Sequence, residues 1–288
     1  MSDGLLIVDK PSGWTSHDVV ARIRRLAGTR RVGHAGTLDP MATGVLVVGL
    51  GRGTRLLGHL ALHDKDYDAT MRLGVRTTTD DAEGDVVEIR DASAVSDGAL
   101  ADAVGRFVGD IDQVPAAVSA VKVDGKRAYA RVREGEPVDL APRRVHVARF
   151  DVVRRHGDDV EVEVTCSTGT YVRALARDVG EALGVGAHLT GLRRTRVGAF
   201  ALAAATPLDQ LREPLPVMSL DLAVAAVFPR VDVDTDTERR LRFGQRVESP
   251  GLAAGTHGVF GPDGAVVALA EDQAGRLRTL VVFPPIAP

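Results

Sequence analysis

Apolar runs separated by polar and glycine-rich stretches mark the start of the chain. The run at residues 5–8 predicts a short buried strand, which ends at the turn signal in residues 10–13. Apolar positions then recur at helical spacing over residues 17–27 and predict a helix. Ser16 is the expected N-cap of this helix, and Gly28 stands where the helix should end.

Strand patterns follow in four places. Residues 45–50 are apolar throughout, and residues 67–73 alternate between apolar and polar side chains. Residues 145–153 and 160–166 are rich in β-branched side chains and are separated by the polar residues 154–159. This spacing predicts a β-hairpin.

Two further helices are predicted. One is predicted over residues 97–108, and apolar positions at helical spacing predict the other over residues 170–183. The polar run at residues 77–85 is typical of turns.

The composition changes near residues 212–230. Beyond them the chain is rich in glycine turns and has two short β-like runs, at residues 265–269 and 278–283. Length favours about two domains, at roughly 150 residues each. We therefore expect a large domain over residues 1–228 and a small β domain over residues 229–288.

Composition places the chain among ordinary globular proteins. Of its 288 residues, 44% are hydrophobic and 26% are charged, so the chain can bury a sizeable core. The 31 glycines follow no Gly-X-Y period, which excludes collagen.

The net charge of −3 argues weakly against a nucleic-acid partner, but local clusters matter more than the sum. Taken alone, these clusters are best interpreted as solvated helix faces. The basic clusters are Arg22, Arg24, Arg25, Arg30 and Arg31; Arg52 and Arg55; Arg143 and Arg144; and Arg193, Arg194 and Arg196.

Cys166 is the only cysteine, which excludes an intramolecular disulfide and suits a reducing cytosol. The run at residues 5–8 is too short for a signal peptide and has no basic flank. No stretch approaches the roughly 18 apolar residues that a membrane span needs. We expect a soluble, cytoplasmic protein without a membrane partner.

The loop at residues 33–40, GHAGTLDP, is the most unusual segment. Its glycines permit positive φ angles, and Pro40 biases Asp39 away from helix, so the Asp39 carboxylate sits on a constrained loop that can aim it. The alternative is that Asp39 only caps the following turn. No second carboxylate lies nearby in sequence, so a glycosidase pair is not visible.

Three other positions carry candidate chemistry. The ring of Tyr67 could stack on a base if exposed, or it could be a half-buried strand residue. Arg173 follows a glycine-containing turn and could pair with a carboxylate or lie on a helix surface. Cys166 lies in a β-rich run, which favours a buried apolar role over a nucleophile.

Cofactor motifs are missing from the sequence. The eight histidines include no HExxH pattern and no ligand cluster, so we expect no metal. The glycine-rich residues 49–54 match neither the dinucleotide fingerprint nor the P-loop.

Taken in order, these segments resemble the bacterial tRNA pseudouridine-55 synthase family, often called TruB. The resemblance covers roughly residues 4–200, and the tail past residue 230 resembles the small PUA-type RNA-binding domain of such enzymes less strongly. The matching blocks are LIVDKPSG (6–13), GHAGTLDP (33–40), ATGVL (42–46), KDY (65–67), RTTTDDAEG (76–84), CSTGTYVR (166–173) and HLTGLRR (188–194).

The resemblance implies a fold and an activity. The fold class is α+β, with a mixed, largely antiparallel sheet, flanking helices and a small C-terminal β domain. The activity is isomerisation of one uridine, at position 55 in the TΨC arm of tRNA, to pseudouridine. It needs no cofactor or metal, and we expect a monomer.

The resemblance also implies site residues. Asp39 is the catalytic aspartate, which acts by attack on ribose C1′, by attack on base C6 or through a glycal intermediate. Arg173 is expected within about 3–4 Å of Asp39, the range of an ion pair, and keeps it ionised. The remaining roles are Tyr67 stacking on the base and assisting proton removal, His34 filling the space of a flipped-out base, Tyr171 and Leu192 lining the uracil pocket, and Lys10 beside the active loop.

Two alternatives come from other classes. The first is a tRNA-binding folding chaperone whose catalysis is dispensable or lost, although the intact Asp39, Tyr67 and Arg173 argue against loss, and an active enzyme could also assist tRNA folding. The second is an unrelated carboxylate hydrolase, which would need another acid or a metal cluster that the sequence does not show.

Overall fold

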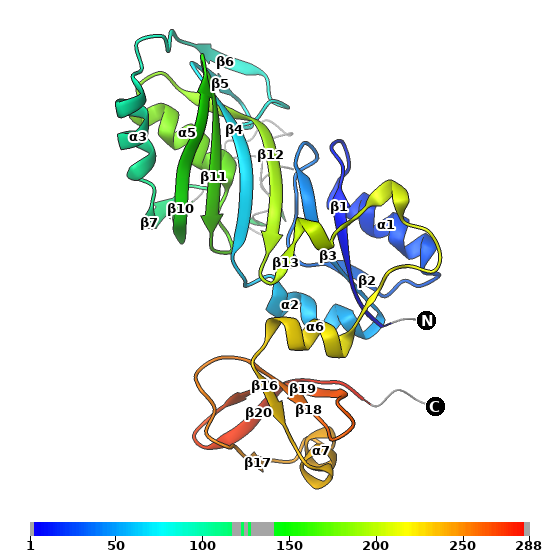
Figure 1. Ribbon diagram of the computed structural model, residues 1–288. Helices are drawn as coiled ribbons and strands as arrows, with labels where there is room; N and C mark the ends of the chain where they lie inside the picture. The colour runs from blue at the N-terminus through cyan, green and yellow to red at the C-terminus, as the bar shows by residue number, and fades with distance from the viewer. Residues whose placement is uncertain (1–2, 117–121, 124–125, 128–140, 285–288) are drawn as a thin grey trace.

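The computed structural model describes residues 3–116, 122–123, 126–127 and 141–284. A large mixed sheet with its helices forms the upper part of the molecule in Figure 1, and a small five-stranded sheet forms the lower part. The predicted α+β class, with a largely antiparallel main sheet, is confirmed.

The large sheet has eleven strands, and its main path runs β14-β1-β3-β12-β4-β11-β10-β7. Along this path, only the β1–β14 and β3–β12 pairs are parallel. The strands are β1 (Gly4–Lys10), β2 (Val32–His34), β3 (Thr43–Leu50), β4 (Lys65–Leu73), β7 (Gly109–Gln113), β10 (Arg143–His156), β11 (Asp159–Cys166), β12 (Ala187–Val197), β13 (Phe200–Ala201), β14 (Thr206–Pro207) and β15 (Met218–Ser219).

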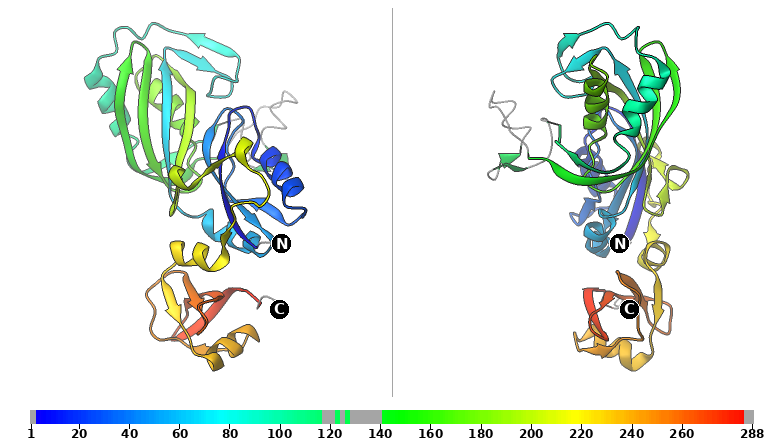
Figure 2. Two further views of the ribbon diagram at one scale, coloured as in Figure 1. Left: turned by 45° about the vertical axis from the view of Figure 1, so that its right-hand side comes forward. Right: turned by 90° about the vertical axis from the view of Figure 1, so that its left-hand side faces the viewer.

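The hydrophobic pattern of β4 explains which face of this sheet is covered. Buried and more exposed side chains alternate along the strand, and Tyr67, Met71 and Leu73 lie on its buried face. These side chains share one apolar cluster with Leu175 of α5 and Leu100 of α3. Helices α3 and α5 therefore cover the same face of the sheet (Figure 2).

Helix α1 and strands β1 and β3 form a second cluster beside the first. The remaining short elements connect the strands or form two small hairpins. The helices are α1 (Ser16–Leu26), α2 (Leu57–Leu60), α3 (Asp97–Gly105), α5 (Val172–Ala182), α6 (Leu220–Val227) and α7 (Thr235–Arg242), with 3-10 turns η1 (Gly51–Leu56), η2 (Leu202–Ala204) and η3 (Leu208–Gln210); the hairpins are β5 (Val75–Thr77) with β6 (Val86–Ile89) and β8 (Lys122–Val123) with β9 (Lys126–Arg127).

The parallel contact between β3 and β12 brings the two halves of the chain together near the site. Thr43 pairs with Arg193, and Gly44 pairs with Arg194. Gly44 has a φ of +100°, and a Cβ added there would lie 2.1 Å from the carbonyl oxygen of Arg194. Only glycine permits this approach, which places the loop before β3 against β12 and β4.

The small sheet has the order β16-β18-β19-β20-β17. The β character predicted for the tail is present, but helix α7 was not expected. Asp234 caps this helix, and two acidic residues lie in its first turn. The strands are β16 (Arg230–Asp232), β17 (Val247–Glu248), β18 (His257–Phe260), β19 (Val266–Asp272) and β20 (Arg276–Val282).

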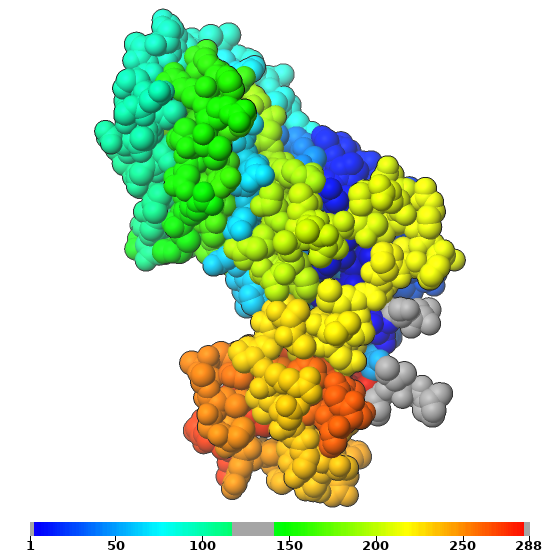
Figure 3. Space-filling view, in the orientation of Figure 1, coloured from blue at the N-terminus to red at the C-terminus, as the bar shows by residue number. Residues whose placement is uncertain are grey.

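The two sheets share an apolar cluster at their junction. Helix α6 lies there (Figure 1), and Figure 3 shows the two parts of the molecule meeting at this level. Leu5 and Leu56 from the large part and Phe260 and Phe283 from the small part all belong to it, and each is at most 1% exposed. Arg55 also donates a hydrogen bond to the carbonyl of Val282 at 2.7 Å. The basic segment at residues 51–59 therefore serves partly to join the two sheets.

Several predicted elements differ at their ends. The helix expected over residues 97–108 ends at Gly105, and the helix expected over residues 170–183 begins at Val172. The strand expected over residues 145–153 extends to His156, so the hairpin turn is shorter than predicted. Fraying and capping decide such ends more than apolar spacing does.

Candidate active site

The Asp39 loop connects β2 to β3 and is held from the sheet side by Arg194. This arginine is 1% exposed, although its sequence neighbours indicated a surface cluster. Its guanidinium donates to the carbonyls of Val45 at 2.8 Å, Gly36 at 3.1 Å and Thr37 at 3.3 Å. A buried cation satisfied by three carbonyls keeps the loop in one conformation.

Ser16 holds the same loop from the other side. It was expected to cap α1, but Thr15 is the cap, in a capping box with Asp18. Ser16 is instead buried, and its hydroxyl accepts from the amide of Leu38 at 2.9 Å and donates to the carbonyl of Leu38 at 3.1 Å. The prediction for Ser16 is therefore wrong by one residue.

Lys10 lies behind the loop rather than in the pocket. Its side chain is fully buried. Its Nζ donates to three carbonyls, those of Trp14 at 2.7 Å, Pro11 at 2.9 Å and Pro40 at 3.1 Å. Burial lowers the pKa of Lys10 to about 8, and the nearby charge of Asp39 opposes that shift. Lys10 thus ties the end of β1 to the residue after Asp39.

Asp39 and Arg173 meet at the mouth of a pocket. The Nε of Arg173 lies 3.0 Å from Oδ2 of Asp39, which confirms the distance expected between them. The Arg173 side chain is 5% exposed and that of Asp39 is 36% exposed. The carboxylate is therefore held by a buried cation while it remains open to a ligand.

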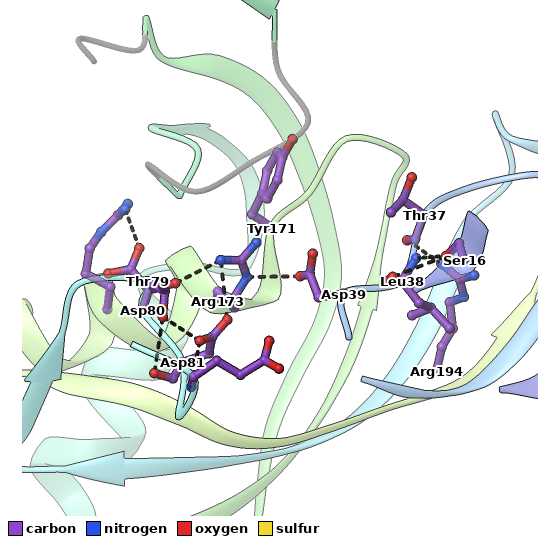
Figure 4. A network of polar contacts seen from close by, with 12 residues as sticks. Ser16, Thr37, Leu38, Asp39, Thr79, Asp80, Asp81, Tyr171, Arg173 and Arg194 are labelled. Atoms are coloured by element: carbon purple, nitrogen blue, oxygen red, sulfur yellow. Dashed lines mark hydrogen bonds and ion pairs between the residues drawn. The ribbon is translucent and has the colours of Figure 1, made fainter. Parts of the chain in front are cut away.

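A second carboxylate, which was not predicted, also contacts Arg173. The Nη1 of Arg173 lies 3.4 Å from Oδ2 of this second carboxylate, that of Asp81, and donates to the carbonyl of Thr79 at 2.8 Å (Figure 4). The Asp81 side chain is 4% exposed, and its Oδ1 accepts from the amide of Glu83 at 3.0 Å. Asp81 thus orients the guanidinium from behind, while Asp39 meets it from the pocket.

The pocket has a volume of about 250 Å³. It contains five of the seven predicted site residues, and Lys10 and His34 lie outside its lining. The lining residues are Gly36, Thr37, Leu38, Asp39, Lys65, Tyr67, Ser167, Thr168, Gly169, Thr170, Tyr171, Val172, Arg173, Leu192 and Arg194.

Tyr67 lies in the wall of this pocket and is 8% exposed. The ring is thus more buried than either alternative from the sequence, but it still borders the pocket. Burial raises the pKa of the Tyr67 phenol, and the charge of Arg194, together with a hydrogen bond to it, opposes that shift. The hydroxyl is consequently protonated at neutral pH.

His34 stands at the end of β2, half-buried beside His17. The two rings meet edge to face with centroids 5.6 Å apart. The Nδ1 of His34 is buried without a hydrogen-bond partner. Burial, followed by the charges of His17 and Arg194, lowers the pKa of His34, so its ring is neutral at physiological pH.

Other chemistry finds no support in the described part of the chain. Cys166 is buried, and burial raises the pKa of its thiol to about 11, so the thiol is not a ready nucleophile. Within the described residues, no group of three or more His, Cys, Asp or Glu side chains could hold a metal ion. No described helix is both long and apolar enough to span a membrane.

Solved structures share this fold. The chain is similar to one in the crystal structure of a Cbf5–Nop10–Gar1 complex, with a TM-score of 0.76 and 28% identity, covering 98% of this chain and 85% of that one. A chain in the structure of an H/ACA RNP bound to a substrate RNA containing 2′-deoxyuridine gives a TM-score of 0.73 at 26% identity, with coverage of 98% and 85%. Both matches extend through the small C-terminal sheet.

Family models cover most of the sequence. Residues 24–172 match the N-terminal domain of the TruB family pseudouridylate synthases, residues 173–218 match the tRNA pseudouridylate synthase B C-terminal domain, and residues 228–284 match the C terminus of tRNA pseudouridine synthase II. The tRNA pseudouridine synthase B of Thermobifida fusca (strain YX) is 56% identical, covering 98% of this chain and 99% of its own length. That of Arthrobacter sp. (strain FB24) is 54% identical, covering 99% and 98%.

The chain therefore belongs to the TruB family of pseudouridylate synthases. The predicted enzyme class, a tRNA pseudouridine synthase, is confirmed, and the alternative of an unrelated carboxylate hydrolase is wrong.

Proposed function

We propose that this enzyme converts uridine 55 in the TΨC arm of tRNA to pseudouridine, with Asp39 acting on a nucleotide that has left the helical stack. The observation that carries the proposal is the Asp39 carboxylate, which opens into a pocket while Arg173 holds it at 3.0 Å. Relatives of the same length and more than half identical in sequence are named tRNA pseudouridine synthase B.

The chemistry requires one bond exchange at the ribose. The bond from N1 of the base to C1′ breaks, and a bond from C5 to C1′ forms. The C5 proton leaves and N1 takes up a proton, so that the composition of the nucleotide does not change. Asp39 serves as nucleophile at C1′ or at C6, or it acts through a glycal intermediate. Because an isomerisation consumes neither oxidant nor reductant, we propose that it needs no cofactor or metal.

The surrounding residues support these steps. Arg173 keeps Asp39 ionised and aimed. Tyr67 lies in the pocket wall, where its ring can stack on the uracil and its hydroxyl can take part in the removal of the C5 proton. Tyr171 and Leu192 complete the wall. His34 presents a neutral ring outside the pocket, suited to fill the gap that the departing base leaves.

All of the described residues that line the pocket come from one chain, so we propose that the enzyme works as a monomer. We also propose that residues 1–228 form the catalytic domain and residues 229–288 a PUA-like domain that contacts RNA. The separate five-stranded sheet that begins at Arg230 supports this division.

Incubation of the purified protein with an unmodified tRNA transcript tests the function. Pseudouridine should form at position 55 and at no other uridine, and a transcript with cytidine at position 55 should remain unmodified. Pseudouridine at another position would contradict the proposed substrate site.

We predict that Tyr67→Phe slows the reaction by about 10²–10⁴-fold, the usual contribution of a positioned acid or base. Because the ring remains, tRNA affinity should stay within about threefold. Arg194 keeps its three carbonyl partners, so the free energy of unfolding should fall by about 1–2 kcal/mol at most. Single-turnover rates and urea unfolding measure both effects. A rate within twofold of the parent enzyme would remove the hydroxyl from the mechanism.

A basic surface at the end of α1 supports an RNA partner. Arg22, Arg25 and Arg30 form no ion pair within the described residues, whereas Arg144 pairs with Asp110 at 3.6 Å. The exposed guanidinium groups of Arg25 and Arg30 therefore remain available for backbone phosphates, whereas the Nε of Arg22 is buried. The α1 cluster is thus the basic region of the sequence best suited to phosphate contacts.

We predict that Arg25→Glu and Arg30→Glu weaken tRNA binding and lower the salt dependence of log K by about one unit for each lost phosphate contact. Arg106→Glu is the matched control, because Arg106 is exposed and forms no ion pair within the described residues, and it follows α3 at the other end of the large sheet (Figure 1). Filter binding across a salt series gives the slopes. If log K depends on salt equally in the α1 variants and in the parent, these arginines contact no phosphate.

A further inference from the structure

A buried glutamine ends strand β7 at the edge of the large sheet. Gln113 is 2% exposed, and its backbone pairs with Arg143 of β10. A primary amide carries both donors and an acceptor, and burying it without partners is costly. Its partners therefore indicate what the residue does.

Both functional ends of this amide bind the backbone of one residue, Tyr171. The Nε2 of Gln113 donates to the carbonyl of Tyr171 at 3.1 Å, and the amide of Tyr171 donates to Oε1 of Gln113 at 2.8 Å. The side chain thus acts like one residue of a neighbouring strand, since it offers a donor and an acceptor together. It fixes the backbone of Tyr171 in an extended conformation, at φ −102° and ψ 106°.

Tyr171 is the residue from which α5 starts, and its own side chain caps nothing. Its side chain lines the pocket, and Arg173, two residues further on, holds Asp39. Figure 4 shows Tyr171 and Arg173 side by side at the start of this helix, with Asp39 facing the guanidinium. A shift of the backbone at Tyr171 would consequently move both groups.

A second contact ties the same region to α5. The residue after Gln113, Val114, accepts a hydrogen bond through its carbonyl from Nη2 of Arg177 at 2.8 Å. Arg177 also pairs with Asp80 at 3.2 Å, next to the Asp81 that orients Arg173. Two attachments at different points along α5 fix its rotation about its own axis.

We propose that Gln113 is a positioning residue for the reaction, whose side-chain amide sets the backbone of Tyr171 and thereby the uracil-pocket wall and the alignment of Arg173 with Asp39. The inference rests on the proposed role of the Asp39 pocket. It adds a residue that does not itself line the pocket and acts through the backbone of Tyr171, which does. Small displacements of aligned groups slow catalysis strongly, so the effect should appear in the chemical step rather than in binding.

The test compares Gln113→Met and Gln113→Glu with the parent enzyme. Methionine fills a similar volume but offers neither hydrogen bond, and glutamate keeps an acceptor but donates only when it is protonated. Asp112→Asn is the matched control, because Asp112 is the neighbour on β7 with an exposed side chain. The measured quantities are the single-turnover rate from about pH 6 to about pH 8, the Kd for tRNA and the thermal unfolding midpoint.

We expect Gln113→Met to lower the single-turnover rate by about 10–100-fold at every pH, with the Kd for tRNA within about threefold of the parent. In Gln113→Glu, burial raises the pKa of the introduced carboxyl, so its protonated fraction grows as the pH falls. Its rate relative to the parent should therefore recover toward about pH 6. Asp112→Asn should match the parent throughout.

Three outcomes would overturn the proposal: rates within twofold of the parent for both variants, an equal and pH-independent loss in both, or a loss confined to tRNA affinity. Asp39→Asn, assayed in parallel, separates this inference from the proposed function. If Asp39→Asn is inactive while the Gln113 variants behave like the parent, only the role of Gln113 is wrong. If Asp39→Asn remains active, the catalytic pocket itself has been misassigned.

Discussion

Asp39→Asn is expected to lower pseudouridine formation by about four orders of magnitude or more, with tRNA binding retained within about threefold. Losing an essential nucleophile removes nearly all of the chemical acceleration that depends on it. Asparagine has nearly the shape of aspartate, and the loop remains held by Arg194, Ser16 and Lys10, so the pocket should persist. A single-turnover assay of proton release from C5, with filter binding alongside, measures both quantities.

Asp68→Asn provides the matched control for Asp39→Asn. Asp68 lies on β4 one residue beyond Tyr67, so its side chain points to the opposite face of the sheet, and it does not line the pocket. It should retain the parent rate. An Asp39→Asn enzyme that still modifies tRNA at an appreciable rate would refute the assignment of the nucleophile.

Arg173→Met is expected to reduce both activity and stability. The guanidinium lies between the Asp39 and Asp81 carboxylates, and its loss leaves the Asp81 carboxylate buried without this cation. Removing one partner of a buried ion pair typically costs about 3–5 kcal/mol. The turnover rate should fall by about 10²–10³-fold, because Asp39 loses the group that aims it. Urea unfolding and single-turnover rates give the two values.

Arg173→Lys and Arg72→Met sharpen this test. Lysine keeps the charge but lacks the planar fork that reaches Asp39, Asp81 and the Thr79 carbonyl together, so stability should recover more than activity. Arg72 pairs with Asp159 on an exposed part of the sheet, and its loss should cost less than about 1 kcal/mol. If Arg173→Met were as stable as Arg72→Met, the buried network would not be a stabilising feature.

The sequence predicts the local elements of the large sheet well, because their patterns depend on neighbouring residues. The alternation over residues 67–73 appears as β4, and the constrained loop with Asp39 lies where its glycines and proline require. The pairing of Asp39 with Arg173 came from the family resemblance, since no local signal joins two residues so far apart in the chain.

Features that depend on distant contacts were missed. Thr15 and Ser16 both have side chains that can cap a helix. The hydroxyl of Ser16 is hydrogen-bonded to the backbone of Leu38 instead, so Thr15 is the cap. From the sequence, Asp81 was interpreted as part of a polar turn. Its partner Arg173 lies in α5, far along the chain, so no local pattern connects the two residues. Arg194 looked like a surface charge, but the carbonyls of the Asp39 loop enclose it.

Helix α7 was missed for a different reason. Leu241 is its one buried residue, so the segment carries almost no apolar periodicity. Its capping aspartate and charge distribution supply the helical signal, and these polar residues alone did not predict a helix.

The apolar cluster shared by the two sheets has a mechanical consequence. Parts of a chain that meet through polar, hydrated surfaces can swing against each other, whereas a dry interface that contains Leu5, Phe260 and Phe283 resists such motion. The hydrogen bonds from Arg52 and Arg55 to the final strand and the residues after it add further attachment. The distance and angle between the surfaces of the two parts are therefore fixed. A tRNA that contacts both parts would have to match this fixed geometry.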